Sequence, residues 1–355
     1  MSSRFQVKTN RLHLPKMKPS LAFFLLLSTN SFCQDRVQEL LNPFQDSLMN
    51  YGLVALVDDG AKKESGAVGW ASEDNPISID NRFCIGSVTK MYTATLVLKL
   101  QELGQMNIQD PISKYIEHHA FIDGEITVKQ LLNHTSGLMD ISDAKLANIA
   151  LLEPDKDYND AYLLSLITAI DFDRGTKYAY SNTNYFLLRK IIEKITDNPY
   201  RDVLTELIID PLQLASTFPY HSNEIEGLAH PILGDQDLHE ISKTATNRIS
   251  VGIGNIVSDA NDVNTFLRAL FIDKTILNEE SLSQMTNFQR HGKTKIGLGV
   301  FEESFGGKTV YGHTGRAISY IAYAHVDVES GTSYVLLCNN ANDPYIDEAI
   351  ENVCE

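Results

Sequence analysis

Short apolar runs typical of strands lie near both ends of the chain, and apolar stretches typical of helices lie between them. Near the N-terminal end, residues 53–57 and 65–71 flank the turn Asp58-Asp59-Gly60, a pattern that predicts a β-hairpin. Residues 140–175 lean towards helix, and the polar stretch 219–248 is expected to form a surface excursion bordering a cleft. Further strands are expected at 296–301, 309–311, 320–328 and 333–337. A buried helix is expected to have Ser87 in its first turn and to end near Gly104, and further helices are expected at 111–116, 128–132, 185–195, 203–209, 259–270 and 347–353.

This order of elements predicts an α+β fold. The economical arrangement is one antiparallel sheet built from both chain ends and flanked by helices, with a mostly helical inserted subdomain over about residues 106–245. A cleft between the sheet and the helical insert would hold the functional site. The chain has 355 residues, of which 43% are hydrophobic, and it is therefore long enough to bury a sizeable core.

The first 33 residues have the pattern of an export signal, which would leave residues 34–355 as a single domain. Basic residues precede an apolar core at Leu21–Leu27, and small residues three and one positions before Gln34 allow cleavage there. Met17 is an alternative start that gives a more compact signal. A retained N-terminal membrane anchor and a lipid on Cys33 stay open as alternatives, although the bulky Phe32 disfavours the lipid. The expected location is periplasmic or secreted.

The charge of the chain excludes some partners. There are 30 Lys and Arg residues against 46 Asp and Glu residues, a net charge of −16. Removing residues 1–33 removes five basic residues and no acidic ones, which leaves 25 against 46, or −21. Such an acidic body repels phosphate backbones and anionic membrane surfaces, so no nucleic-acid partner is expected.

Cysteine and histidine spacing indicates no metal site and no cofactor. The chain has no C-x-x-C or H-E-x-x-H motif. Cys84, Cys338 and Cys354 remain after the export signal, and buried free thiols are expected for them. A disulfide between Cys338 and Cys354 stays open as the alternative.

Three short motifs carry the candidate chemistry: Ser87-Val88-Thr89-Lys90, Tyr180-Ser181-Asn182 and His313-Thr314-Gly315. The S-x-x-K spacing alone is weak, since it also occurs at Ser142-Asp143-Ala144-Lys145. The context favours the first copy, because a long apolar helix follows Ser87 whereas an ordinary turn precedes Ser142.

Ser87 and Lys90 are three residues apart and therefore share one face of the predicted helix. Desolvation and a nearby cation can lower the pKa of a lysine, so a buried Lys90 could accept the hydroxyl proton of Ser87. The helix N-terminus would place backbone N–H groups near the nucleophile. The alternative is that Lys90 only caps or pairs locally.

Tyr180 and Asn182 are two residues apart and would point the same way in an extended segment. The Tyr180 phenol could pass a proton to the leaving group, and the Asn182 amide could hold a substrate carbonyl or tune Lys90. The alternative for Tyr180 is a core aromatic. His313 would start the strand that lines the cleft, and its imidazole can be neutral or charged near neutral pH. Thr314 would offer its hydroxyl to a substrate carboxylate.

Four segments, 83–90, 131–138, 178–185 and 311–315, together resemble the serine β-lactamase / D-alanyl-D-alanine carboxypeptidase superfamily in its class C-like branch. The similarity runs from about Leu53 to Asn340. It implies Ser87 as the nucleophile of an acyl-serine hydrolase, and His134 as a residue that holds a turn without a catalytic role. In this branch, lactamases usually have lysine where His313 stands, whereas histidine is usual among the peptidases.

The residues after His313 complete the site that the resemblance implies. Gly315 would let the substrate backbone come close. The backbone N–H of Arg316 would form the oxyanion hole together with that of Ser87. The Arg316 guanidinium stands where the family often has a small residue, and it could bind a substrate carboxylate; the alternative is that it points to solvent.

The expected function is therefore an exported serine hydrolase acting on peptide-like substrates, with D-Ala-D-Ala carboxypeptidase or a related peptidase as the leading activity. A β-lactamase or small-ester hydrolase is the alternative among enzymes. A penicillin-binding or scaffold protein without turnover is the alternative of another class. The expected partner is a small-molecule or peptide substrate of the cell-wall or β-lactam class, and the oligomeric state is left open.

Overall fold

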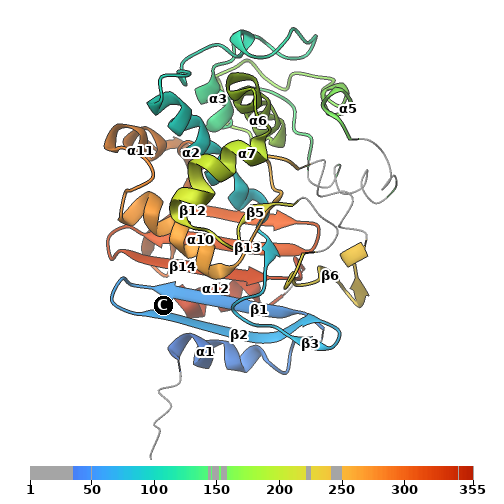
Figure 1. Ribbon diagram of the computed structural model, residues 1–355, viewed down its shortest axis with the longest axis vertical. Coiled ribbons are helices and arrows are strands. Elements are labelled where there is room, and N and C mark those ends of the chain that lie inside the picture. The colour runs from blue at the N-terminus through green and yellow to red at the C-terminus, as the bar shows by residue number, and fades with distance from the viewer. Residues whose placement is uncertain are drawn as a thin grey trace, which may run out of the picture. The chain divides into compact units, whose positions relative to one another are not determined.

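Strands from both ends of the chain lie side by side in one antiparallel sheet of the computed structural model (Figure 1). In the described part of the chain, this sheet has nine strands in the order β3-β2-β1-β14-β13-β12-β11-β10-β9. They are β1 (Gly52–Asp58), β2 (Lys63–Ser72), β3 (Asn75–Pro76), β9 (Gln289–His291), β10 (Thr294–Ile296), β11 (Phe301–Phe305), β12 (Lys308–Ala317), β13 (Tyr320–Asp327) and β14 (Thr332–Cys338). Because β1 pairs with β14, from Leu53↔Cys338 to Asp58↔Ser333, the predicted sheet built from both chain ends is confirmed.

The structure describes residues 35–48, 50–142, 145, 152, 158–220, 225–240, 250–342 and 344–354. The predicted export signal, with Met17 and Cys33, lies outside these residues, as does the end of the predicted helical insert at 241–245.

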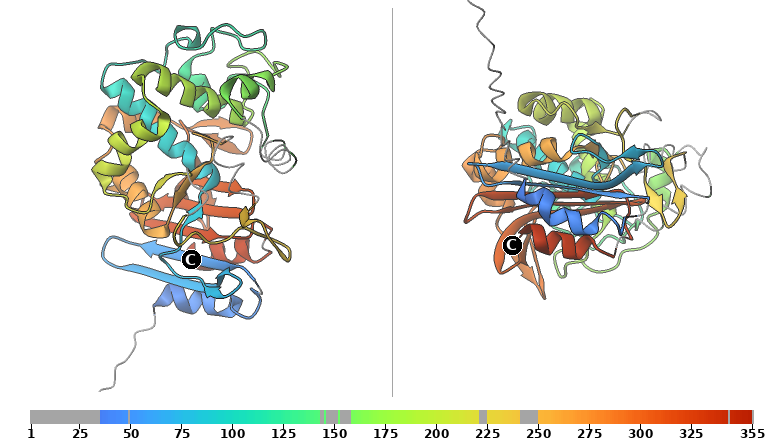
Figure 2. Two further views of the ribbon diagram at one scale, coloured as in Figure 1. Left: turned by 45° about the vertical axis from the view of Figure 1, so that its right-hand side comes forward. Right: turned by 90° about the horizontal axis from the view of Figure 1, so that it is seen from below.

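Alternating residues along β1 explain how both faces of the sheet are covered. Successive strand residues point to opposite faces. Leu53 and Ala55 accordingly belong to the core cluster beneath α1 (Arg36–Leu41) and α12 (Ile346–Cys354), whereas Val54 belongs to the larger core on the other face. Figure 2 shows α1 and α12 together on one side of the sheet.

The larger core is formed with α2 (Thr89–Glu102), α6 (Asn182–Thr196) and α10 (Ala260–Leu267). The shorter helices are α3 (Val128–Leu132), α5 (Asp160–Ser165), α7 (Tyr200–Leu204), α8 (Asp210–Leu212) and α11 (Glu279–Met285). The described residues also form two small sheets: β4 (Phe83–Cys84), β8 (Ile256–Ser258) and β5 (Phe218–Pro219), and the hairpin of β6 (Ile232–Leu233) and β7 (Gln236–Asp237). The helices α3, α5 and α6 lie at the end of the molecule away from the β1–β2 hairpin (Figure 1).

Three local predictions are wrong, each for a local reason. The strand expected at 296–301 is the turn between β10 and β11, closed by a hydrogen bond of 2.8 Å from Gly297 N–H to the Val300 carbonyl. The strand expected at 309–311 extends to Ala317, so His313 lies in the middle of β12 rather than at its start. The helix expected at 111–116 is a single 3₁₀ turn over Ile112–Lys114, which follows Pro111 in extended conformation.

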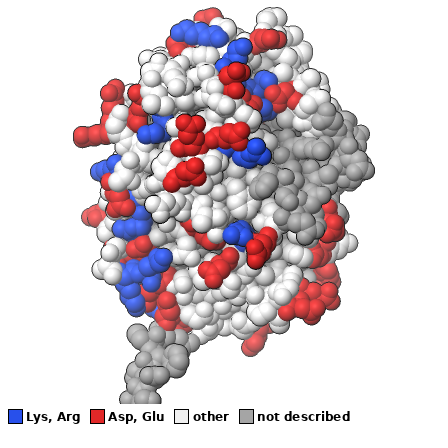
Figure 3. Space-filling view, viewed as in Figure 1, with Lys and Arg blue, Asp and Glu red and all other residues white. Residues whose placement is uncertain are grey.

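The side chains of Cys84, Cys338 and Cys354 are buried, as expected. None of the helices among the described residues is long and apolar enough to span a bilayer. Acidic side chains are spread over the face seen in Figure 3 and alternate with lysines and arginines, so this face presents no large basic patch.

Candidate active site

Ser87 lies in the 3₁₀ turn Gly86–Val88 that leads into α2. Gly86 has a φ of +52°, and a Cβ atom on it would lie 2.6 Å from the backbone nitrogen of Arg316. Only glycine combines this conformation with such a close approach of two backbones. The turn therefore places the nucleophile candidate directly against strand β12.

Lys90 lies one turn after Ser87, in the first turn of α2, and its side chain is fully buried. Its Nζ donates hydrogen bonds to Ser87 Oγ at 2.8 Å and to the Ile253 carbonyl at 2.9 Å. The same nitrogen is 5.2 Å from the centre of the Tyr180 ring. The predicted contact between Ser87 and Lys90 is thus present, and Ile253 is a partner that the sequence analysis missed.

The Tyr180 hydroxyl donates a hydrogen bond of 2.8 Å to Ser87 Oγ. Ser87 Oγ therefore lies between the amine of Lys90 and the phenol of Tyr180, at the same distance from both. Because the Ser87 side chain is only 7% exposed, these two groups dominate its surroundings. The arrangement can move a proton away from the serine hydroxyl and return one through the phenol.

Asn182 differs from the prediction in its backbone. Ser181 is extended, with φ −147° and ψ 123°, but Asn182 is the first residue of α6. Its backbone N–H donates to Asp140 Oδ1 at 2.6 Å, and a carboxylate at this place stabilises a helix N-terminus. Asp140 was missed because it lies 42 residues before Asn182 and no local pattern joins the two.

His313 is buried in β12, opposite Ala324 of β13. Its Nδ1 lies 2.7 Å from the Thr314 carbonyl oxygen, which can only accept, so Nδ1 carries the proton and Nε2 carries the lone pair. Burial lowers the pKa of His313 to about 3. At neutral pH, this position therefore presents a neutral imidazole, held against the Phe301 ring at 4.9 Å.

Gly315 and Arg316 bring the backbone of β12 to the nucleophile turn. A Cβ atom on Gly315 would lie 1.9 Å from the Ile85 carbonyl oxygen and 3.1 Å from Ser87 N. The backbone of β12 at Gly315 and Arg316 therefore lies against the turn that carries Ser87. An oxyanion hole formed by the backbone N–H groups of Ser87 and Arg316 stays a prediction. The Arg316 side chain is exposed, and its Nη1 donates to the Ala341 carbonyl at 2.7 Å.

The second S-x-x-K motif has a local role. Ser142 Oγ accepts a hydrogen bond of 3.2 Å from the backbone N–H of Lys145. A serine side chain that accepts from the N–H three residues later is a common turn or cap arrangement. This contact agrees with the expectation of an ordinary turn at Ser142.

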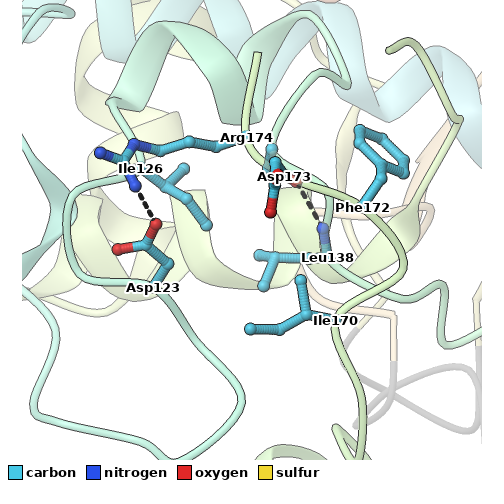
Figure 4. Close-up of a pocket in the computed structure, with 8 residues that line it drawn as sticks. Asp123, Ile126, Leu138, Ile170, Phe172, Asp173 and Arg174 are labelled. Carbon is cyan, nitrogen blue, oxygen red and sulfur yellow. Dashed lines mark hydrogen bonds and ion pairs between the residues drawn. The ribbon is translucent and has the colours of Figure 1, made fainter. Parts of the chain in front are cut away.

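A separate pocket of about 270 Å³ is lined by Ser136 and Leu138, which follow His134 in the chain, and by residues of two other segments (Figure 4). Asp123 and Arg174, which also line it, form an ion pair. Its lining contains none of Ser87, Lys90 and Tyr180, so it is distinct from the candidate active site. No three His, Cys, Asp or Glu side chains among the residues that the structure describes are grouped to hold a metal ion.

Comparisons with known proteins place the chain in a family. The model of the family described as Beta-lactamase matches residues 38–353. PbpX of Bacillus subtilis, a protein named for penicillin binding, is 28% identical over 278 residues, covering 75% of this chain and 66% of the relative. The teichoic acid D-alanine hydrolase of Staphylococcus aureus is 32% identical over 178 residues, covering 50% of this chain and 42% of the relative.

Among solved structures, the D-stereospecific amidohydrolase from a Streptomyces species matches with a TM-score of 0.76 and 28% identity. The match covers 90% of this chain and 97% of the amidohydrolase. The matches to the two curated relatives span less than two thirds of either relative's length. Because the family model covers nearly the whole described part of the chain, the protein belongs to the β-lactamase family of serine hydrolases.

Proposed function

We propose that the protein is an exported acyl-serine hydrolase that cleaves a peptide-like bond beside a D-amino acid. D-Ala-D-Ala carboxypeptidase activity, or that of a related peptidase, is the leading form. The observation that carries the proposal is the position of Ser87 Oγ, which is 2.8 Å from Lys90 Nζ and 2.8 Å from the Tyr180 hydroxyl.

In the acylation step, the unprotonated amine of Lys90 takes the proton of the Ser87 hydroxyl as Oγ attacks the substrate carbonyl. The carbonyl oxygen becomes an oxyanion, held by the backbone N–H groups of Ser87 and Arg316. Tyr180 donates its proton to the leaving nitrogen, the C–N bond breaks, and an ester on Ser87 remains. The proton on Lys90 then passes to the phenolate oxygen of Tyr180, which restores the neutral amine and the neutral phenol.

Deacylation repeats these steps with water in place of Ser87. Tyr180 and Lys90 together accept a proton from the water as it attacks the ester carbonyl. The C–O bond to Ser87 breaks, Oγ takes back a proton, and the free acid leaves. Both steps use the same three side chains, so one arrangement accounts for the whole cycle.

Two observations support a D-amino acid substrate over a β-lactam. One relative is named as a D-alanine hydrolase and one structural neighbour as a D-stereospecific amidohydrolase. The neutral His313 supplies no positive charge where the branch's lactamases usually have lysine. The Thr314 hydroxyl and, as the sequence predicts, the Arg316 guanidinium would then bind the terminal carboxylate of the substrate.

A small-ester hydrolase, the alternative that the sequence leaves open, is the second candidate, and one relative is named a teichoic acid D-alanine hydrolase. A substrate panel separates the candidates: a D-Ala-D-Ala peptide, a D-amino acid amide, a D-alanyl ester and nitrocefin. Intact mass spectrometry during turnover shows the acyl-enzyme and the product together. Turnover of the peptide or amide supports the proposal, and turnover confined to the ester or to nitrocefin contradicts it. The Ser87→Ala variant is the control.

Export is part of the proposal and has its own test. The motivating feature is the basic and apolar pattern of residues 1–33. N-terminal sequencing of the mature protein from its source cell is expected to begin at or near Gln34. A full-length chain in the cytoplasmic fraction would contradict export without affecting the proposed chemistry.

A further inference from the structure

The Tyr180 backbone is held on both sides by one residue, His134. The backbone N–H of Ala179 donates to the His134 carbonyl oxygen at 3.0 Å. The backbone N–H of Ser181 donates to His134 Nδ1 at 3.1 Å. The two residues that flank Tyr180 are therefore tied to the main chain and to the side chain of the same histidine.

The ring of His134 also contacts the Tyr180 ring directly. The two rings are stacked with their centres 4.4 Å apart and an angle of 27° between their planes. The His134 side chain is 1% exposed, so it has little freedom to move away from this contact. The ring thus fixes the plane of the phenol, while the two hydrogen bonds fix its backbone.

Neighbouring groups determine which ring nitrogen of His134 accepts hydrogen bonds and which carries the proton. The Ser136 hydroxyl donates to Asn184 Oδ1 at 2.6 Å, so the amide nitrogen of Asn184 is the end that faces the histidine. That nitrogen lies 3.1 Å from His134 Nδ1. Nδ1 is therefore an acceptor for both Asn184 and Ser181, and the ring proton lies on Nε2.

The charge state of the ring agrees with this assignment. Burial lowers the pKa of His134 well below its ordinary value of 6.5. A protonated ring would put a hydrogen on Nδ1 and would break the bonds from Ser181 and Asn184. His134 can therefore hold Tyr180 only as a neutral imidazole.

We propose that His134 is a positioning residue that holds the Tyr180 phenol against Ser87 Oγ during acyl transfer. The inference rests on the proposed function, because it assigns His134 to the proton-transfer step of that reaction. It goes beyond the turn-holding role that the resemblance implies, because the ring stack and the hydrogen bond from Ser181 act on Tyr180 and its flanking backbone.

Two substitutions separate the ring stack between His134 and Tyr180 from the hydrogen bond that His134 Nδ1 accepts from Ser181. His134→Asn keeps an acceptor near the Nδ1 position and tolerates a positive φ, but it removes the ring. His134→Phe keeps a ring that can stack on Tyr180, but it removes the acceptor. The matched control is His118→Asn, the same exchange at an exposed histidine, which is expected to leave acylation unchanged.

The first readout is the acylation rate of Ser87, followed by intact mass with a fluorescent β-lactam, with kcat and KM for the best substrate of the panel. His134→Phe is expected to lower the acylation rate and kcat roughly 100-fold, because a misplacement of about 1 Å costs that much. KM of the His134→Phe variant is expected to change much less than its kcat. His134→Asn is expected to lose less of the acylation rate than His134→Phe does. Melting temperatures show whether each variant is folded. A folded His134→Phe variant that acylates like the wild type would overturn the proposal.

The second readout is a double-mutant cycle with Tyr180→Phe, which lacks the phenol that His134 positions. If His134 acts through Tyr180, His134→Phe causes little further loss in the Tyr180→Phe background. An equal fold-loss in both backgrounds would show that His134 acts only on overall structure, and the proposal would then fail.

A third readout does not require activity. In a crystal structure of His134→Asn or His134→Phe, the Tyr180 hydroxyl is expected to have moved out of hydrogen-bond distance of Ser87 Oγ. An unchanged distance would refute positioning by His134. If wild-type Ser87 is not acylated by any member of the panel, the proposed function fails, and the crystal structures still decide whether His134 places Tyr180.

Discussion

Gly315 and Ile85 approach each other so closely that a Cβ atom on Gly315 would lie 1.9 Å from the Ile85 carbonyl oxygen. Strand β12 and the nucleophile turn therefore touch through their main chains, with no side chain between them. This contact, together with that of Gly86 and Arg316, sets the position of Ser87 relative to the strand.

Gly315→Ala is accordingly expected to force the two backbones apart. The nucleophile turn would move by several tenths of an ångström or more, and the two N–H groups proposed as the oxyanion hole would separate. Loss of one oxyanion donor typically costs about 10²- to 10³-fold in kcat. We expect a loss of at least that size in steady-state kinetics, with a lower melting temperature. Gly331→Ala, at a glycine whose Cβ would meet nothing within 4 Å, is a control for stability alone. Normal kcat in a folded Gly315→Ala variant would contradict the role of this contact.

Ser87→Ala is expected to abolish covalent labelling by a β-lactam or a phosphonate, because the attacking oxygen is removed. Ser142→Ala is expected to leave labelling intact, since Ser142 Oγ accepts from the Lys145 backbone in a local turn. Labelling is read by intact mass and by peptide mapping. The reverse pattern would assign the nucleophile to the second motif.

Lys90→Arg is expected to lower the rate of acylation roughly 10²- to 10⁴-fold, the range that general-base catalysis contributes. A guanidinium keeps its proton and cannot accept one from Ser87. The matched control is Lys99→Arg, near the other end of the same helix, where the lysine pairs with Glu102. Acylation of a folded Lys90→Arg variant at a near-normal rate would rule out Lys90 as the base.

Arg316→Ala is expected to raise KM for a substrate with a free carboxylate by about tenfold, or about 1.4 kcal/mol. The guanidinium donates one hydrogen bond to Ala341 and has further donors for a carboxylate. KM for a neutral ester of the same core should hardly change, and Arg316→Lys should retain part of the effect. Equal changes for both substrates would mean that the side chain acts on structure.

His313 gives the stability of the protein a pH dependence. Its pKa is about 3 in the folded protein and near 6.5 when exposed, so the unfolded chain takes up a proton first as the pH falls. The stabilisation from neutral His313 is complete above pH 6.5 and is lost progressively between 6.5 and 3, by at most about 1.4 kcal/mol per pH unit. The free energy of unfolding, measured with urea at pH 7.5 and 5.0, should differ less between the two pH values for His313→Gln than for the wild type. Equal differences would contradict the buried neutral state.

Local patterns in the sequence predicted the parts of the site that depend on local geometry. Ser87 and Lys90 are three residues apart on a helix, so their contact follows from the helical repeat alone. The short apolar runs at 53–57 and 333–337 likewise predicted strands near both chain ends, and β1 and β14 join one sheet.

Contacts between distant segments could not be predicted in this way. No spacing rule connects Asp140 to the start of α6, or the Ile253 carbonyl to Lys90. The link from His134 to Tyr180 depends on a turn with positive φ and on a ring stack, and neither leaves a repeat in the sequence. The turn at 297–300 has the apolar composition of a strand because Leu298 and Val300 are buried in the core, so composition alone does not reveal the turn.

The pairing of β1 with β14 has a consequence for how the protein folds. Leu53 pairs with Cys338, so a strand made early on the ribosome gains its second neighbour only when nearly the whole chain has been synthesised. Contacts of such high sequence separation slow folding, because a long loop must close before they form. Until then β1 has one open edge, which can pair with another chain. Slow refolding and aggregation of chains truncated before β14 are the expected cost of this topology.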